Sequence, residues 1–174
     1  ASNFPLAFST AGGDTVAALA AGCPVVFKAH SGHMATAELV AEAIEKAIEV
    51  CGMPKGTFNM IFGGRIGANL VEHPLIQAAG FTGSLEGGMA LYNLAQSRPQ
   101  PIPFFAEMSS VNPVVVLSQA LSSRGEQIAQ DTVASFNMGC GQFCTKPGLI
   151  LGVEGPEFDS FVAALAESTQ KAVP

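Results

Sequence analysis

Cys23-Pro24-Val25-Val26-Phe27-Lys28 is a short apolar run rich in β-formers, and a helical pattern over 36–50 and a second apolar run over 58–62 follow it. In the helical pattern, apolar residues recur every three or four positions until Gly52 and Pro54 end it. Strands this apolar, separated by a helix, are typical of a parallel sheet covered on both faces. This stretch therefore predicts an α/β fold.

The same alternation continues along the rest of the chain. It predicts helices at 14–21, 67–72, 85–96, 126–138 and 157–172, and strands at 76–81, 104–107, 113–117 and 149–153. Asp14 is the expected N-cap of the first of these helices. Right-handed crossovers would join the strands into doubly wound, mostly parallel sheets. The proline-rich segment 99–103 interrupts the rhythm and is the best candidate for a boundary.

Composition excludes several classes of function. The 174 residues are 48 % hydrophobic and 13 % charged, which argues against disorder. The net charge of −6 gives no footprint for nucleic acid and disfavours an anionic membrane surface. No run approaches the roughly 18 apolar residues of a membrane span, and the first residues show no export signal. We therefore expect a cytoplasmic protein.

The cysteines and histidines do not predict a metal site. Four scattered cysteines are typical of reduced thiols rather than of a disulfide framework. Cys140 and Cys144 are four residues apart, and His30 and His33 are three apart. Neither pair has a second pair of cysteines or histidines nearby that would complete a zinc site. We expect no metal.

Three glycine-containing turns follow predicted strands, at 29–32, 62–67 and 81–88. In open α/β sheets ligands bind at the carboxyl ends of strands, where helix N-termini offer N–H groups. None of the turns has the Gly-x-Gly-x-x-Gly dinucleotide fingerprint. Sharp turns in a compact sheet explain them equally well, because glycine is the default residue there.

The segment Asn137-Met138-Gly139-Cys140-Gly141-Gln142-Phe143-Cys144-Thr145 closes a predicted helix with glycines around two cysteines. A catalytic thiol needs access, and glycine permits the close approach of a substrate. The alternative is a buried cysteine that acts as a small hydrophobe. No histidine follows Cys144, which argues against a cysteine protease.

Glu107 ends the apolar run that begins with Pro103-Phe104-Phe105. Burying a carboxylate at that place is costly without a partner or a task. One such task is that of a general base near neutral pH. A solvated acid at the start of a loop is the alternative.

Together these segments resemble the aldehyde dehydrogenase superfamily over nearly the whole chain. Asn3-Phe4-Pro5-Leu6 looks like the family's Asn-Phe-Pro segment, and Glu107 falls on the general base of its Glu-Leu-Gly-Gly motif. Gly141-Gln142-Phe143-Cys144 looks like the Gly-Gln-x-Cys motif of the nucleophile. The resemblance implies that an aldehyde is oxidised to a carboxylic acid through a thiohemiacetal and a thioester on Cys144. Asn3 would hold the oxyanion and Glu107 would activate water.

The resemblance also implies a dinucleotide cofactor. Val25-Val26-Phe27-Lys28 looks like the strand whose lysine binds the ribose, and Phe81-Thr82-Gly83-Ser84 with Gly88 looks like the turn that meets the pyrophosphate. Many NAD-using members carry a glutamate at the position of Ser31. A serine there does not repel a 2′-phosphate, and His30 could add partial positive charge. We therefore expect NADP to be preferred, with NAD as the alternative cofactor, unless Ser31 merely caps a helix.

The chain departs from the family pattern in two ways. The Glu-Leu-Gly-Gly motif reads Glu107-Met108-Ser109-Ser110, without its glycines. The chain is also short for the family, so we expect a fragment of a homo-oligomeric protein. Its parts would be a dinucleotide-binding core at 1–106 and the start of a catalytic α/β domain at 107–174. Its sequence does not specify which small-molecule aldehyde is bound.

Two alternatives to this function remain open. In an acylating aldehyde dehydrogenase coenzyme A, rather than water, would take the acyl group, and the presence of Glu107 argues for water. The second alternative is a non-catalytic nucleotide-binding fragment.

Overall fold

The computed structural model describes residues 2–4 and 6–172, so Pro5 of the Asn3–Leu6 segment lies outside the described residues. The chain divides into two compact units, of which unit 1 ends at Met108 and unit 2 begins at Ser109. The Pro99–Pro103 segment lies inside unit 1, so the boundary between the units is not at these prolines. The expected domain boundary after residue 106 refers to the domains of a longer protein and stays a prediction.

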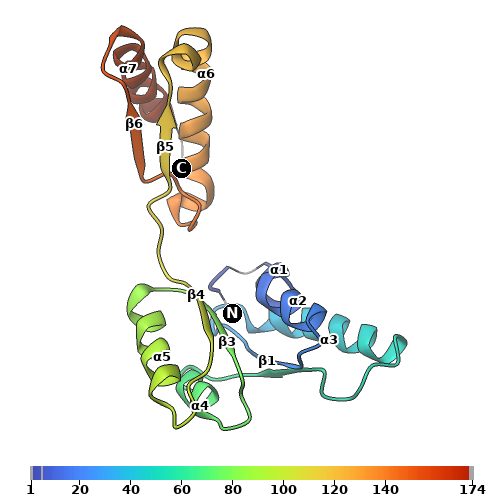
Figure 1. Ribbon diagram of the computed structural model, residues 1–174. Coiled ribbons are helices and arrows are strands. Elements are labelled where there is room, and N and C mark those ends of the chain that lie inside the picture. The colour runs from blue at the N-terminus through green and yellow to red at the C-terminus, as the bar shows by residue number, and fades with distance from the viewer. Residues whose placement is uncertain (1, 5, 173–174) are drawn as a thin grey trace. The chain divides into compact units, whose positions relative to one another are not determined.

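Unit 1 alternates helices with short strands (Figure 1). Its elements are α1 (Phe8–Ala11), α2 (Gly13–Ala20), β1 (Val25–Lys28), α3 (Met34–Val50), β2 (Phe58–Ile61), α4 (Gly67–Glu72), β3 (Ala79–Thr82), α5 (Leu85–Ser97) and β4 (Phe104–Glu107). The strands form two parallel pairs. β1 pairs with β2 so that Lys28 lies opposite Ile61, and β3 pairs with β4 so that Thr82 lies opposite Glu107.

The first strand pair of unit 1 is covered by α3. The buried residues Phe27 and Phe58 come from the two strands, and Ala37 and Ala41 come from the helix. Small alanines let the helix approach the aromatic rings closely, and the two rings stack with centroids 6.2 Å apart. The helix ends where Gly52 adopts φ +63, a left-handed conformation that glycine adopts without steric cost.

Unit 2 holds β5 (Pro113–Val116), α6 (Ser118–Asn137), the 3₁₀ helix η1 (Met138–Gly141), β6 (Leu149–Gly152) and α7 (Pro156–Lys171). β5 and β6 are parallel, with Pro113 opposite Leu149. Figure 1 shows α6 and α7 beside this strand pair, and Val116, Leu121, Ala129 and Phe161 form the buried core. Each unit therefore repeats the strand–helix–strand plan.

The α/β class with parallel strands is confirmed, but several details differ. The described strands form three two-stranded sheets. Several strand side chains are exposed, among them Phe105 at 67 % and Val115 at 65 %, so the described residues leave part of the strand surface uncovered. Helix α2 has Gly12, not Asp14, as its N-cap. Helix α6 starts at Ser118, well before the predicted residue, and continues across a kink at Arg124.

No helix among the described residues is both long enough and apolar enough to span a bilayer.

Candidate active site

The turn after β1 carries the residues expected at the ribose of a dinucleotide. Lys28 is the last residue of β1, and Ser31 is exposed in the turn before α3. The N-cap residue of α3 is His33, and no side chain makes a cap hydrogen bond there. The alternative role of Ser31 as a helix cap is therefore wrong, and its hydroxyl lies in a solvent-exposed turn.

Two histidines in the same turn stack on each other, with ring centroids 5.4 Å apart. Burial lowers the pKa of His30 below its usual 6.5, and the neighbouring His33 and Lys28 lower it further. The lowered pKa disfavours the positive charge that was expected on His30. His33 is buried, and its Nε2 lies 2.9 Å from the carbonyl oxygen of Ser2. This contact ties the segment of Asn3 to the start of α3.

The turn between β3 and α5 contains the residues expected at the pyrophosphate. Ser84 is the N-cap of α5, and its Oγ accepts a hydrogen bond from the backbone N–H of Gly87 at 3.2 Å. A Cβ on Gly83 would lie 2.6 Å from the ring of Phe81. The backbone here lies close to its neighbours, so a side chain at residue 83 would not fit without a shift of that ring.

These features fit a dinucleotide. Gly83 and Ser84 are exposed, so a phosphate can reach the turn. A helix of 13 residues begins there, and the N-terminus of such a helix attracts anions. The Ser84 hydroxyl uses a lone pair in its cap hydrogen bond, so its own proton remains for a phosphate oxygen.

Glu107 is the last residue of β4, and its side chain is exposed within unit 1. Among the described residues Glu107 is therefore a solvated acid and not a buried carboxylate. Its carbonyl oxygen accepts a hydrogen bond from the N–H of Gly83 at 3.0 Å. The candidate base thus lies at the same strand edge as the candidate pyrophosphate turn. Asn3 is also exposed, near the beginning of unit 1.

The loop of the candidate nucleophile belongs to unit 2. Helix α6 ends at Asn137, and Gly139, Cys140 and Gly141 then adopt φ values of +59°, +58° and +70°. Cys140 and Cys144 therefore do not share a helix face. All four cysteines of the chain are free and exposed. The alternative of a cysteine buried as a small hydrophobe is wrong for both residues of this loop.

Two side chains that the sequence analysis did not single out hold this loop. Asn112 and Ser110 both hydrogen-bond to the backbone carbonyl oxygen of Cys144. Their signal in the sequence is weak, because polar residues before a proline are common in turns. Only the pairing of β5 with β6 brings them to the loop.

Unit 1 places Gly83, Ser84, Gly88 and Glu107 around the carboxyl ends of β3 and β4, and it places Lys28 and Ser31 at the carboxyl end of β1. Cys144 lies in unit 2, where only its own surroundings are described. No group of three or more His, Cys, Asp or Glu side chains in the described part of the chain could hold a metal ion.

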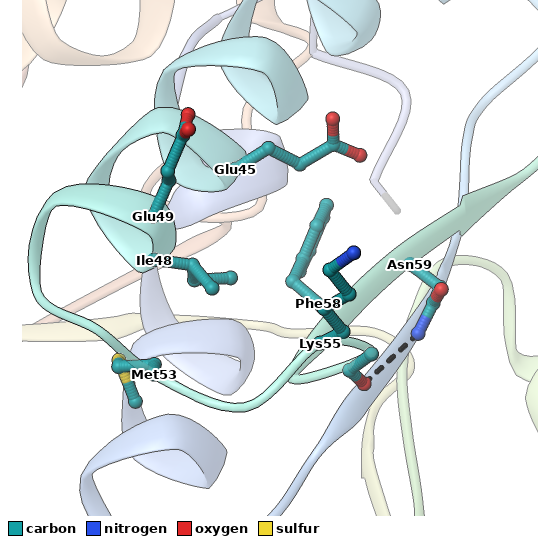
Figure 2. A pocket seen from close by; sticks show the side chains of 8 residues that line it. Glu45, Ile48, Glu49, Met53, Lys55, Phe58 and Asn59 are labelled. Carbon is teal, nitrogen blue, oxygen red and sulfur yellow. Dashed lines mark hydrogen bonds between the residues drawn. The ribbon is translucent and has the colours of Figure 1, made fainter.

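Two pockets of about 460 and 480 Å³ lie away from these residues. Figure 2 shows the first, where side chains of α3 and of the loop before β2 surround Phe58, and Asn59 donates a hydrogen bond to the Gly56 carbonyl oxygen at 3.0 Å. Phe58 begins β2, whereas Lys28 lies opposite the last residue of that strand. This pocket is therefore at the other end of the strand pair from the candidate cofactor residues.

Parallel strands that lead through turns into helices define the class of α/β proteins that bind ligands at the carboxyl ends of their strands. Comparison with known proteins specifies the family. A model of the aldehyde dehydrogenase family matches residues 2–173, and the chain belongs to this family.

Relatives of the chain carry names from this family. The chain is 82 % identical to an alpha-ketoglutaric semialdehyde dehydrogenase of Acinetobacter baylyi, over all of the chain and 33 % of that protein. It is 57 % identical to alpha-ketoglutaric semialdehyde dehydrogenase 2 of Azospirillum brasilense, over 98 % of the chain and 33 % of that protein. The chain therefore spans about a third of the length of these curated relatives.

A solved structure is similar as well. An aldehyde dehydrogenase from Bartonella henselae matches 89 % of the chain and 31 % of its own length, with 25 % identity and a TM-score of 0.73. The fold expected from the sequence is the fold of this part of the family.

Proposed function

We propose that the protein to which this chain belongs oxidises a semialdehyde to a carboxylic acid with NAD(P), and that alpha-ketoglutaric semialdehyde is its substrate. The observation that carries the proposal is the 82 % identity, over the entire chain, with a dehydrogenase named for that substrate. The exposed thiol of Cys144 in a glycine-rich loop supports the proposal chemically, because a substrate carbonyl can approach it.

The proposed chemistry begins at Cys144. Its thiolate attacks the aldehyde carbon and forms a C–S bond, and the carbonyl electron pair moves to oxygen. The Asn3 amide and the Cys144 backbone N–H hold this oxyanion. Oxidised NAD(P), when bound, would accept a hydride from the former aldehyde carbon, and loss of this hydride would leave a thioester on Cys144. Glu107 then takes a proton from water, whose oxygen attacks the thioester, and the carboxylic acid and the thiol are released.

The proposed cofactor residues are Lys28, Ser31, Gly83, Ser84 and Gly88. Lys28 ends β1 and Ser31 is exposed in the turn that follows, where a ribose and its 2′-substituent would lie. Ser31 carries no charge that would repel a 2′-phosphate, and the Lys28 ammonium attracts one. We propose that NADP is used at least as well as NAD.

The direct test compares thiol variants of the full-length protein. With alpha-ketoglutaric semialdehyde and NADP, Cys144→Ala should abolish turnover, because alanine has no thiol with which to form the thioester. Cys140→Ala is the matched control: it removes a second exposed thiol of the same loop and should keep most of the activity. Equal loss in both variants contradicts the assignment of the nucleophile.

The acceptor of the acyl group is tested in the same assay. Water as acceptor predicts the free acid as product whether or not coenzyme A is present. Formation of an acyl-coenzyme A would favour the acylating reaction instead. Dinucleotide binding by calorimetry without any turnover in the full-length protein would favour a non-catalytic role.

A further inference from the structure

The backbone carbonyl of Cys144 is held by side chains from one short segment. Asn112 Nδ2 lies 2.6 Å from this carbonyl oxygen and 2.9 Å from the carbonyl oxygen of Lys146. The Ser110 hydroxyl donates to the same Cys144 oxygen, and its Oγ lies 3.1 Å from Asn112 Nδ2. We call these two side chains the carbonyl clamp. It fixes the carbonyl groups on both sides of Thr145.

The hydrogen-bond donors of the clamp face acceptor atoms. A carboxamide nitrogen carries two N–H groups, and carbonyl oxygens only accept. Asn112 therefore presents its nitrogen to the Cys144 and Lys146 carbonyls, and Ser110 Oγ is a third acceptor that shares its two N–H groups. Its backbone adopts φ +49, a region that asparagine tolerates better than most residues. Asparagine at position 112 therefore fits both the left-handed backbone conformation and the hydrogen bonds to the carbonyl groups.

The loop that carries Cys144 is held in place by the segment of Ser110 and Asn112. Gly139–Gly141, which precede Cys144, have left-handed φ values and lie outside regular α-helix. After the loop, the N–H of Gly148 donates to the carbonyl oxygen of Val111 at 2.9 Å, next to the start of the β5–β6 ladder. Between these points the clamp holds the peptide group of Cys144 itself.

We infer that Asn112, together with Ser110, is a positioning residue for the nucleophile. The inference rests on the proposed function of Cys144. The thiol side chain, the N–H and the clamped carbonyl of Cys144 all extend from the same short stretch of backbone. Holding the carbonyl therefore sets the directions in which the thiol attacks and the N–H meets the oxyanion. Loss of such orientation slows the chemical step even when the thiol remains present.

The test uses variants of the full-length protein. Asn112→Asp keeps the size and the tolerance of positive φ, but it sets acceptor oxygens against two carbonyl oxygens. Asn112→Gly keeps the backbone conformation and removes the amide. Asn59→Asp is the matched control, since Asn59 also donates one side-chain hydrogen bond to a carbonyl, that of Gly56 in unit 1.

The first-turnover rate of NADPH formation is the primary measurement. Both Asn112 variants should slow it by about 10- to 100-fold, the range expected from misplacing a reacting group by about 1 Å. The KM for NADP should remain within about twofold of wild type, because the clamp touches none of the proposed cofactor residues. The Asn59→Asp variant should keep the wild-type rate. A wild-type first-turnover rate in both Asn112 variants would overturn the inference.

Alkylation of Cys144 by iodoacetamide separates positioning from a structural effect. This small electrophile needs no fixed direction of approach, so its rate should stay within about threefold of wild type while the hydride step slows. A parallel loss of both rates would overturn the positioning role. Activity retained by Cys144→Ala would instead overturn the proposed function, which is a separate result.

Ser110→Ala keeps the test decisive if the Asn112 variants do not fold. It removes one donor to the Cys144 carbonyl and leaves the strained residue 112 unchanged. Its first-turnover rate should fall by roughly three- to tenfold, less than for Asn112, because one donor of the clamp remains. An unchanged rate in folded Ser110→Ala would overturn the clamp.

Discussion

The backbone N–H of Gly83 donates a hydrogen bond to the carbonyl oxygen of Glu107 at 3.0 Å, where the parallel strands β3 and β4 end together. This contact links the turn proposed to bind the pyrophosphate to the residue proposed to activate water. Gly88 adds a second link, since a Cβ there would lie 2.7 Å from Cγ of Met108, the residue after Glu107. The start of α5 therefore packs directly against the end of β4 that carries the candidate base.

Gly88→Ala should destabilise the protein through this contact. Overpacking of this kind costs about 1 to 3 kcal/mol. Gly67→Ala is the control, because Gly67 begins α4 and a Cβ on it would meet no atom within 4 Å. Both variants gain helix propensity, so the difference in their free energies of unfolding isolates the contact. Urea denaturation that gives the two variants equal stability would contradict the packing described here.

Glu107→Gln in the full-length protein should slow deacylation more than hydride transfer. The amide keeps the size of the side chain but cannot take a proton from water. Acyl-enzyme should then accumulate after a burst of reduced cofactor, which rapid mixing and intact-mass measurement detect. Loss of the burst together with the steady rate would instead assign Glu107 to the activation of Cys144.

Ser31→Glu should shift cofactor use towards NAD. Like charges about 4 Å apart repel by on the order of 1 to 4 kcal/mol near a protein surface, and each 1.4 kcal/mol corresponds to about tenfold. The ratio of kcat/KM for NADP to that for NAD should therefore fall roughly ten- to thousandfold, mainly through the KM for NADP. Ser31→Ala is the neutral control. A wild type that already prefers NAD would contradict this role for Ser31.

The stability of the protein should fall as the pH drops below about 6.5. Burial and the neighbouring His33 and Lys28 lower the pKa of His30 in the folded state, so the unfolded chain binds the proton more tightly. The loss begins near the ordinary value of 6.5 and levels off below the lowered pKa.

His30→Asn should reduce this loss, because asparagine can still accept the hydrogen bond that His30 Nδ1 accepts from the Gly32 N–H. Thermal unfolding at about pH 7.5 and about pH 5 measures the difference. An equal loss in both proteins would assign the pH dependence to other groups.

Local sequence signals are sufficient to predict most of the helices and strands. Helix α4 begins and ends at the predicted residues, and so does β4, because apolar periodicity and flanking turn residues mark both. Helix α6 was predicted too short because Ser118–Gly125 is poor in apolar residues. A kink at Arg124 and the buried Leu121 show that tertiary packing holds this first part.

The candidate site was predictable only where its residues lie in one continuous segment. Ser84 could be recognised as the start of a helix, since the turn chemistry is local. The exposure of Glu107 and the contacts of Asn112 depend on which strands pair and what covers them. Spacing along the chain carries no such information. Residues four apart, such as Cys140 and Cys144, share a face only in a continuous helix, and here the helix ends three residues before Cys140.

The run of left-handed residues at Gly139, Cys140 and Gly141 limits how this loop can vary over evolutionary time. Each non-glycine residue in that conformation costs roughly 1 to 2 kcal/mol, and β-branched residues cost more. In a library randomised at these three codons, functional clones should therefore return glycine most often, with asparagine and aspartate next. Cys140 is the one side chain that already bears this cost, so glycine at that position is the substitution that drift would accept most easily.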